Sequence, residues 1–332
     1  MPLAGPVRAL VAVAVAVVLA GCGEDQQAAS PGAGSPATDY PTKSIRFLVP
    51  YGAGGPTDLT SRTVGACLEQ ELGQTVVVEN KPGASGALAT TDLKAAKPDG
   101  HTLALVTAGT MVLTPLASQV GYTKDDITPV GVMAEVPSLL AVGKDSPYKD
   151  AKAFLDAAKA RPDQLKVGVP GASTPQAIEL QRLAKDHGVK VTIVPFNGNA
   201  EMTTALLGRN IDAVLINASA DVVQNVDSGQ FVPLAASPEE RLSWLPDTPT
   251  FVELGYAGLT LSGSTFGLAG PAGLPADVTS TLENSLRTCL DKPDVRTKLG
   301  ERYVTEQFVD GRALKAILDE TQSVYAPILG KA

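Results

Sequence analysis

A run of small residues is the first stretch of this chain whose composition suits ligand binding. It reads Val-Pro-Tyr-Gly-Ala-Gly-Gly-Pro-Thr-Asp and ends at Asp58. The apolar run Ile45 to Val49 is typical of a buried strand, and apolar residues at helical spacing follow as far as Gly73. The glycines therefore lie in a strand-to-helix turn, where free backbone N–H groups and the helix dipole favour an anion. A tight turn without any ligand would use the same residues.

The turn does not match two known phosphate-binding motifs. A dinucleotide fingerprint needs G-x-G-x-x-G, and counting from Gly52 the third glycine position is Thr57. A P-loop needs Gly-Lys-Ser/Thr, and no such tripeptide follows. We expect Thr57 or Asp58 to be the N-cap of the helix, with Asp58 bracing the loop rather than acting as a catalytic carboxylate.

Segments typical of strands and helices alternate along the rest of the chain, which predicts an α/β fold with largely parallel sheets covered by helices. The expected strands are residues 45–49, 75–79, 102–107, 139–142, 165–169, 189–194 and 211–216. The expected helices include residues 149–160, 176–185, 200–207 and 220–226, and one that ends near residue 96. The strands fall into two series, so we expect two sheets.

Small or polar residues follow the ends of several expected strands, and a further turn of small residues spans 80–86. Ligands gather beyond the carboxyl ends of parallel strands, so a ligand would lie between the two sheets if these edges face each other. The candidate ligand-binding residues are Tyr51, Gly52, Ala53, Gly54, Gly55, Thr57, Asp58, Thr107, Gly109, Thr110, Gly171, Ala172, Ser173, Thr174, Phe196, Asn197, Gly198 and Asn217.

Composition and charge restrict the class of function. The chain has 332 residues, of which 44% are apolar, enough for two globular domains. Its net charge of −8 argues against nucleic acid as a partner. The two histidines, His101 and His187, have no Glu or Cys at metal-ligand spacing, and there is no G-x-S-x-G nucleophile motif. We therefore expect no metal, no cofactor and no catalysis, with a small-molecule enzyme as the less favoured alternative.

The N-terminus has the pattern of an export signal. An apolar run of 12 residues, Ala9 to Ala20, is too short to span a bilayer and ends at Leu19-Ala20-Gly21-Cys22. This tetrapeptide resembles the lipobox of bacterial lipoproteins, in which the cysteine is lipidated. We expect residues 1–21 to be a lipoprotein signal peptide and residues 22–39 a flexible tether that anchors an extracytoplasmic protein to the cell membrane. An ordinary signal peptide followed by a chance cysteine is the alternative.

The chain resembles the substrate-binding proteins of tripartite tricarboxylate transporters, the Bug family, from about Tyr40 to its C-terminus. The family's order of motifs is kept from Tyr40-Pro41 and Val49-Pro50-Tyr51 onward. The later motifs are Val78-Glu79-Asn80-Lys81-Pro82-Gly83-Ala84, Pro98-Asp99-Gly100, Val194-Pro195-Phe196, Leu245-Pro246-Asp247-Thr248-Pro249-Thr250 and Gly267-Leu268-Ala269-Gly270-Pro271-Ala272-Gly273. Departures at Ala53, Asn197 and Phe266, where the family commonly has Pro, Lys and Trp, leave the ligand open.

This resemblance implies a type II periplasmic-binding-protein-like fold with the ligand cleft between two domains. The first domain would be residues 40–140 and 263–332, and the second residues 141–262. Family members bind small carboxylates, such as di- or tricarboxylates, largely through backbone N–H groups and water. They deliver them to a membrane permease. We expect a monomer here. A receptor that feeds a sensor partner is the alternative that the sequence leaves open.

Two cysteines remain once Cys22 takes lipid. Cys67 and Cys289 both fall on the apolar side of expected helices, in a compartment where disulfides persist. The topology implied by the resemblance returns the C-terminal helix to the first domain, so the two could meet. We hypothesise a disulfide between them, and two buried free thiols are the alternative.

The lipobox interpretation can be tested at its cysteine. Replacing Cys22 by Ser removes the thiol that would receive lipid, so Cys22→Ser should release the protein from the membrane fraction or leave an uncleaved precursor. Membrane fractionation and intact mass measure these outcomes. A variant with the fractionation and processing of the wild type would contradict the interpretation.

Overall fold

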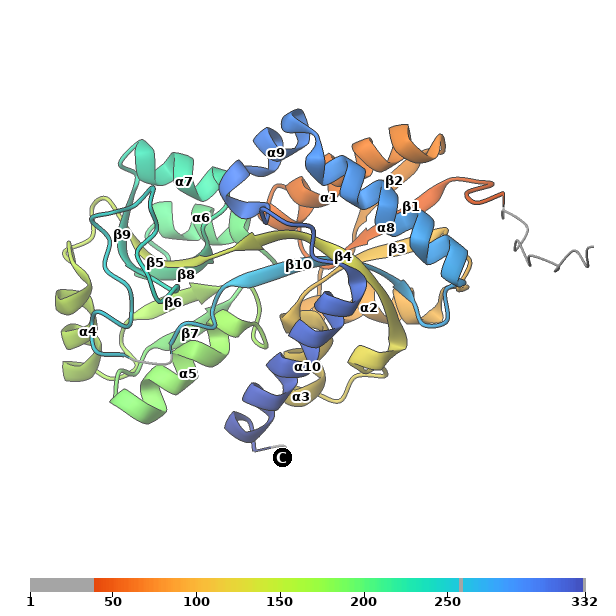
Figure 1. The fold of residues 1–332 in the computed structure, drawn as a ribbon. Coiled ribbons are helices and arrows are strands. Elements are labelled where there is room, and N and C mark those ends of the chain that lie inside the picture. The colour runs from red at the N-terminus through yellow and green to blue at the C-terminus, as the bar shows by residue number, and fades with distance from the viewer. Residues whose placement is uncertain (1–38, 257–258, 331–332) are drawn as a thin grey trace, which may run out of the picture. The chain divides into compact units, whose positions relative to one another are not determined.

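The computed structural model describes residues 39–256 and 259–330 and contains two five-stranded sheets (Figure 1). The predicted signal peptide, Cys22 and nearly all of the tether lie outside the described residues. Within 39–256 and 259–330, no helix has the length and apolar character needed to cross a membrane. The same ranges contain no group of three or more His, Cys, Asp or Glu residues arranged to hold a metal ion.

The first sheet has the order β2-β1-β3-β10-β4. Its strands are β1 (Ile45–Val49), β2 (Val76–Asn80), β3 (Thr102–Val106), β4 (Ile127–Val136) and β10 (Ser264–Pro271). Strand β1 is parallel to β2 and β3, whereas β10 is antiparallel to β3 and β4. The helices that precede or follow these strands are α1 (Pro56–Leu72), α2 (Ala87–Ala95), α3 (Thr114–Ala117), α8 (Ala276–Asp291), α9 (Pro293–Leu299) and α10 (Gly311–Ile328).

The second sheet has the order β7-β6-β8-β5-β9. Its strands are β5 (Ser138–Gly143), β6 (Lys166–Val169), β7 (Thr192–Pro195), β8 (Ala213–Asn217) and β9 (Phe231–Ala236). Strand β6 is parallel to β7 and β8, and β5 is antiparallel to β8 and β9. The helices between these strands are α4 (Ala151–Ala160), α5 (Pro175–His187), α6 (Asn199–Leu207) and α7 (Ala220–Asp227).

Two expectations about local structure were wrong. The sheets are mixed rather than largely parallel, because β5 and β10 follow crossings between the sheets and enter antiparallel to their neighbours. Helix α1 begins at Pro56, so its N-cap is Gly55 and neither Thr57 nor Asp58. Strand β4, ten residues long, is absent from the strands expected from sequence, because its pairing with β10 shifts register twice and so obscures the two-residue period.

The chain crosses between the sheets at two places. A single residue, Pro137, separates β4 from β5, and the return leads from β9 to β10, which begins at Ser264. Each sheet therefore contains one strand that directly follows a crossing and runs antiparallel to both of its neighbours. This strand is β10 in the first sheet and β5 in the second. The domain limits expected from sequence, 40–140 with 263–332 and 141–262, stay a prediction.

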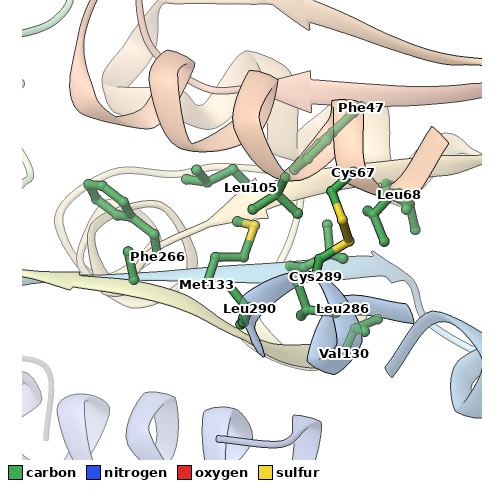
Figure 2. Packing of buried hydrophobic residues seen from close by; sticks show 14 of the residues in the cluster. Phe47, Cys67, Leu68, Leu105, Val130, Met133, Phe266, Leu286, Cys289 and Leu290 are labelled. Carbon is green, nitrogen blue, oxygen red and sulfur yellow. A yellow bond between two sulfur atoms is a disulfide. The ribbon is translucent and has the colours of Figure 1, made fainter. Parts of the chain in front are cut away.

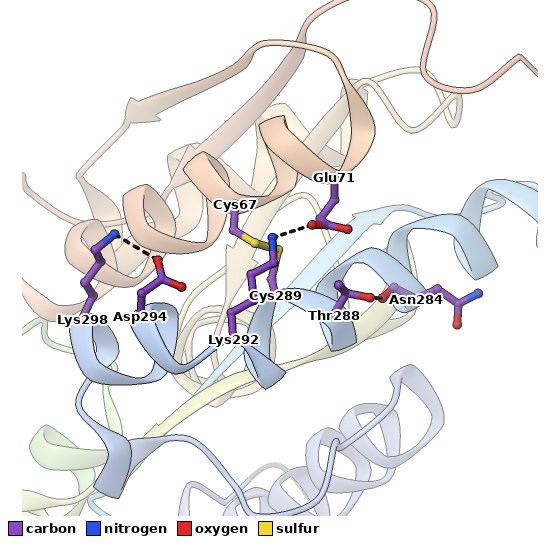
Figure 3. The surroundings of a disulfide bond; sticks show 8 residues. All are labelled: Cys67, Glu71, Asn284, Thr288, Cys289, Lys292, Asp294 and Lys298. Atoms are coloured by element: carbon purple, nitrogen blue, oxygen red, sulfur yellow. Dashed lines mark hydrogen bonds and ion pairs between the residues drawn. A yellow bond between two sulfur atoms is a disulfide. The ribbon is translucent and has the colours of Figure 1, made fainter.

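The core of the first sheet packs against α1 and α8, as Figure 2 shows. Phe47 of β1 and Leu68 of α1 are fully buried there, as is Leu286 of α8. Cys67 of α1 and Cys289 of α8 form a disulfide within this cluster, with their Cα atoms 5.8 Å apart. Beside the disulfide, Lys292 Nζ and Glu71 Oε1 form an ion pair at 2.5 Å (Figure 3). The returning C-terminal segment is thus fixed to α1, whose first turn begins at the glycine-rich loop.

Reducing this disulfide should lower stability without changing any residue. The bond encloses a long loop, with a sequence separation of 222. A cross-link of this kind typically contributes about 2–4 kcal/mol to the free energy of unfolding, with long loops at the upper end. Urea unfolding of the wild type with and without reductant measures the difference. The double variant Cys67→Ala, Cys289→Ala is the control and should not respond to reductant, and a wild type equally stable under both conditions would contradict the prediction.

Candidate functional site

A cavity lies where the carboxyl ends of strands from both sheets meet. The space not filled by atoms is about 390 Å³, counting its open mouth. The first sheet supplies the loop between β1 and α1, Thr107 after β3, and two residues of β10. The second supplies the ends of β6 and β8 with the loops before α5 and α6. The lining residues are Tyr51, Gly52, Gly55, Pro56, Thr57, Thr107, Pro170, Thr174, Pro175, Gln176, Gly198, Asn199, Asn217, Ser264 and Phe266.

The N-terminus of α1 opens into this cavity. Its N-cap is Gly55, which has no side-chain capping bond, and Pro56 occupies the first helical position. The first N–H groups of a helix have no partner within the helix, so those of the first turn are left for a ligand. This helix has 17 residues, long enough for a full dipole at its end.

The glycine-rich loop is held in place by Asp58 from the first turn of α1. Asp58 Oδ2 accepts a hydrogen bond from the backbone N–H of Gly54 at 3.0 Å, and Oδ1 pairs with Arg62 at 3.0 Å. Burial by itself would raise the pKa of Asp58, but the bonds from Arg62 and Gly54 outweigh it and lower the pKa. Gly54 adopts a φ of +81°, a conformation that favours glycine. Asp58 therefore braces the loop, as the sequence suggested, and its lowered pKa favours the ionised form.

Two further helices direct their N-termini at the cavity. Helix α5 begins after Thr174, whose Oγ1 accepts from the N–H of Ala177 at 3.5 Å. Helix α6 begins after Gly198 and, like α1, has no side-chain cap. Gly198 and Asn199, and likewise Thr174 and Pro175, line the cavity. Three helix ends with partial positive charge therefore meet at one space.

The lining of the cavity contains no ionic group. None of its fifteen residues, all in the described part of the chain, is Asp, Glu, Lys, Arg or His. Burial raises the pKa of Tyr51 to about 12, although a hydrogen bond with the Thr107 side chain opposes this, so its phenol is neutral at physiological pH. The helix ends are therefore the positively polarised groups at the cavity, and this arrangement suits reversible binding of an anion.

The loops of the two sheets touch each other beside the cavity. The N–H of Gly52 donates to the carbonyl of Asn197 at 2.9 Å. The N–H of Ser173 approaches Ser85 Oγ at 3.3 Å. These two contacts join the turns of the first sheet to those of the second, so the structure shows the two edges closed on each other.

The structure distributes the sequence-predicted residues unevenly around the cavity. Tyr51, Gly52, Gly55, Thr57, Thr107, Thr174, Gly198 and Asn217 line it. The other ten, Ala53, Gly54, Asp58, Gly109, Thr110, Gly171, Ala172, Ser173, Phe196 and Asn197, lie in or beside the same turns but outside the lining. Thr110, for example, exchanges hydrogen bonds with Thr107 and orients it. A role of any of the eighteen in binding a ligand stays a prediction.

Sequence reasoning missed seven lining residues. Four of them, Pro56, Pro175, Gln176 and Asn199, lie in the first helical turns that follow predicted loops, and Pro170 directly follows a predicted strand. Extending each loop by one or two residues would have found them. Ser264 and Phe266 belong to β10, which reaches the cavity only through the second crossing between sheets.

Comparison with solved structures defines the class of protein. The chain is similar to MatC from Rhodopseudomonas palustris with bound malate, with a TM-score of 0.81 and 30% identity over 87% of this chain and 100% of that one. It is also similar to a second R. palustris protein, solved with adipate, with a TM-score of 0.80 and 27% identity over 88% of this chain and 98% of that one. The fold is that of the periplasmic binding proteins, as predicted.

Sequence comparison gives the family. The sequence model of the family described as "Tripartite tricarboxylate transporter family receptor" matches residues 60–331. The "UPF0065 protein in gbd 5'region" of Cupriavidus necator is 30% identical over 296 residues, which cover 89% of each chain. The protein belongs to this receptor family, and the resemblance noted in the sequence is confirmed.

Proposed function

We propose that this protein is an extracytoplasmic receptor that captures a small di- or tricarboxylate, or a related organic acid, in the cavity between its sheets. The observation that supports this most strongly is the convergence of the α1, α5 and α6 N-termini on a space lined by uncharged residues. An anion is the ligand that such a set of dipoles stabilises. A carboxylate is small and flat enough to reach backbone N–H groups beside glycine.

The comparisons support the same class of ligand. Two similar structures are described with malate and with adipate, both dicarboxylates. We therefore place carboxylates first among ligands to be tested.

The second part of the proposal concerns delivery. Membership of a transporter receptor family supports a membrane permease as the partner of the liganded protein. The lipobox-like Cys22 and the tether would keep the binding body near that permease. Delivery requires release as well as capture, which suits a site that binds through hydrogen bonds and dipoles.

Filling the space beside the α1 N-terminus tests the site. Gly55 lines the cavity with a φ of −91°, so a side chain is not excluded by backbone strain. A Cβ there would lie 3.7 Å from the backbone N of Asn199, and the larger Gly55→Val side chain would occupy ligand space. In the wild type, a carboxylate at about 100 times its Kd should stabilise the folded state by about 2.7 kcal/mol and raise Tm by about 5–10 °C. Gly55→Val should abolish this shift.

The control is Gly121→Val, because a Cβ at Gly121 would have no heavy atom within 4 Å. This variant should keep the full shift in Tm. The panel contains malate, succinate, adipate, citrate and neutral sugars, measured by thermal unfolding. A shift given by neutral solutes but by no carboxylate would contradict the ligand class, and a full shift in Gly55→Val would contradict the site.

A further inference from the structure

Gln176 is a buried polar residue whose hydrogen bonding is incomplete. It lies in the first turn of α5, lines the cavity and is 0% exposed. Its amide nitrogen Nε2 donates to Ser138 Oγ at 3.0 Å and to Asn217 Oδ1 at 2.8 Å. Both amide hydrogens are therefore used. The amide oxygen Oε1 is buried and has no hydrogen-bond partner among the described residues.

The hydrogen bonds around Gln176 fix which way its amide faces. Ser138 has one hydroxyl hydrogen, and Oγ donates it to the backbone carbonyl of Ser262 at 2.7 Å. Ser138 Oγ must then accept from Gln176, which requires the nitrogen of the Gln176 amide to face it. A flipped amide would place Oε1 against the acceptor Asn217 Oδ1. The unpartnered atom is therefore an acceptor.

A buried acceptor without a donor destabilises the structure that contains it, so most such groups in folded proteins have a partner. Ser138 and Asn217 belong to β5 and β8 of the second sheet, and they take both N–H groups of Gln176. Gln176 lines the cavity, and its oxygen is buried while the edges of the two sheets are closed on each other, so we infer that a ligand reaches this atom when those edges part. The missing partner must bring a hydrogen to donate.

We propose that Gln176 selects a carboxylate that bears a hydroxyl group, with the ligand O–H donating to Gln176 Oε1. This inference rests on the proposed function and names the ligand class more closely. An ionised carboxylate only accepts hydrogen bonds, so a plain dicarboxylate cannot satisfy Oε1. An ammonium group could donate, but the fifteen lining residues include no carboxylate to balance its charge. A hydroxy acid meets both conditions.

A purely structural role for Gln176 would give a different result. Ser138 follows the first crossing between the sheets, and Ser262 precedes the second, so Gln176 also joins the two crossings. Damage to these contacts would weaken all ligands alike. The ratio of two affinities, one for a hydroxy acid and one for the same acid without the hydroxyl, isolates the contact to Oε1.

Isothermal titration of the full chain with matched acids makes the comparison. The pairs are malate with succinate, 2-hydroxyglutarate with glutarate, and citrate with tricarballylate, and aspartate is the amino analogue of malate. In the pair that binds, the hydroxy acid should bind about 5–10-fold more tightly, the ratio expected for one hydrogen bond. Aspartate should bind more weakly than malate. This part of the test needs no variant and so does not depend on the folding of a mutant.

Gln176→Met keeps the length of the side chain and removes its amide, so the preference for the hydroxy acid should fall to within about twofold. Gln181→Met, the same change at an exposed position of α5, should leave the preference intact. Equal binding of both acids by the wild type, tighter binding of aspartate than malate, or an unchanged preference in Gln176→Met would overturn the inference while carboxylate binding stands. Failure of every acid to bind would overturn the proposed function, and this inference with it.

Discussion

The N-terminus of a helix leaves backbone N–H groups without partners inside the helix. The character of the cavity in this protein depends on three such N-termini that begin beside it. Helices α1, α5 and α6 all begin at the cavity, two of them after glycines that supply no capping side chain. Elsewhere, α4 and α10 are capped by the aspartates Asp150 and Asp310. The uncapped N-termini of α1 and α6 thus leave N–H groups that a ligand in the cavity can satisfy.

The rest of the fold keeps those helix ends in position. The disulfide from Cys67 to Cys289 fixes α1 to the returning C-terminal segment, and Asp58 holds the loop before α1. The contact of Gly52 with Asn197 joins the turns of the two sheets beside the cavity. A binding site made of dipoles needs this rigidity, because weak partial charges act only at short range.

The sequence predicted the glycine-rich turn and the α/β class because strand periods and small-residue loops are local signals. The strand Ile45–Val49 was predicted with the bounds that the structure gives it. The mixed sheets and the contribution of β10 could not be predicted from local signals, because they depend on where the chain crosses between sheets. The amide oxygen of Gln176 is left without a partner because the amide nitrogen bonds to residues 38 and 41 positions away in the sequence. No spacing rule indicates these residues. Similarly, the spacing of apolar residues predicted that Cys67 and Cys289 lie on the apolar sides of their helices, but only the packing of α1 on α8 brings them together.

We propose that backbone dipoles, without a cationic side chain, hold the carboxylate. A crystal structure of the protein with the carboxylate that gives the largest rise in Tm tests it most directly. We expect carboxylate oxygens within about 3.2 Å of backbone nitrogens in the first turns of α1 and α6. No Lys, Arg or His nitrogen should lie within about 4 Å of those oxygens. A salt bridge from such a side chain to the bound carboxylate would contradict it.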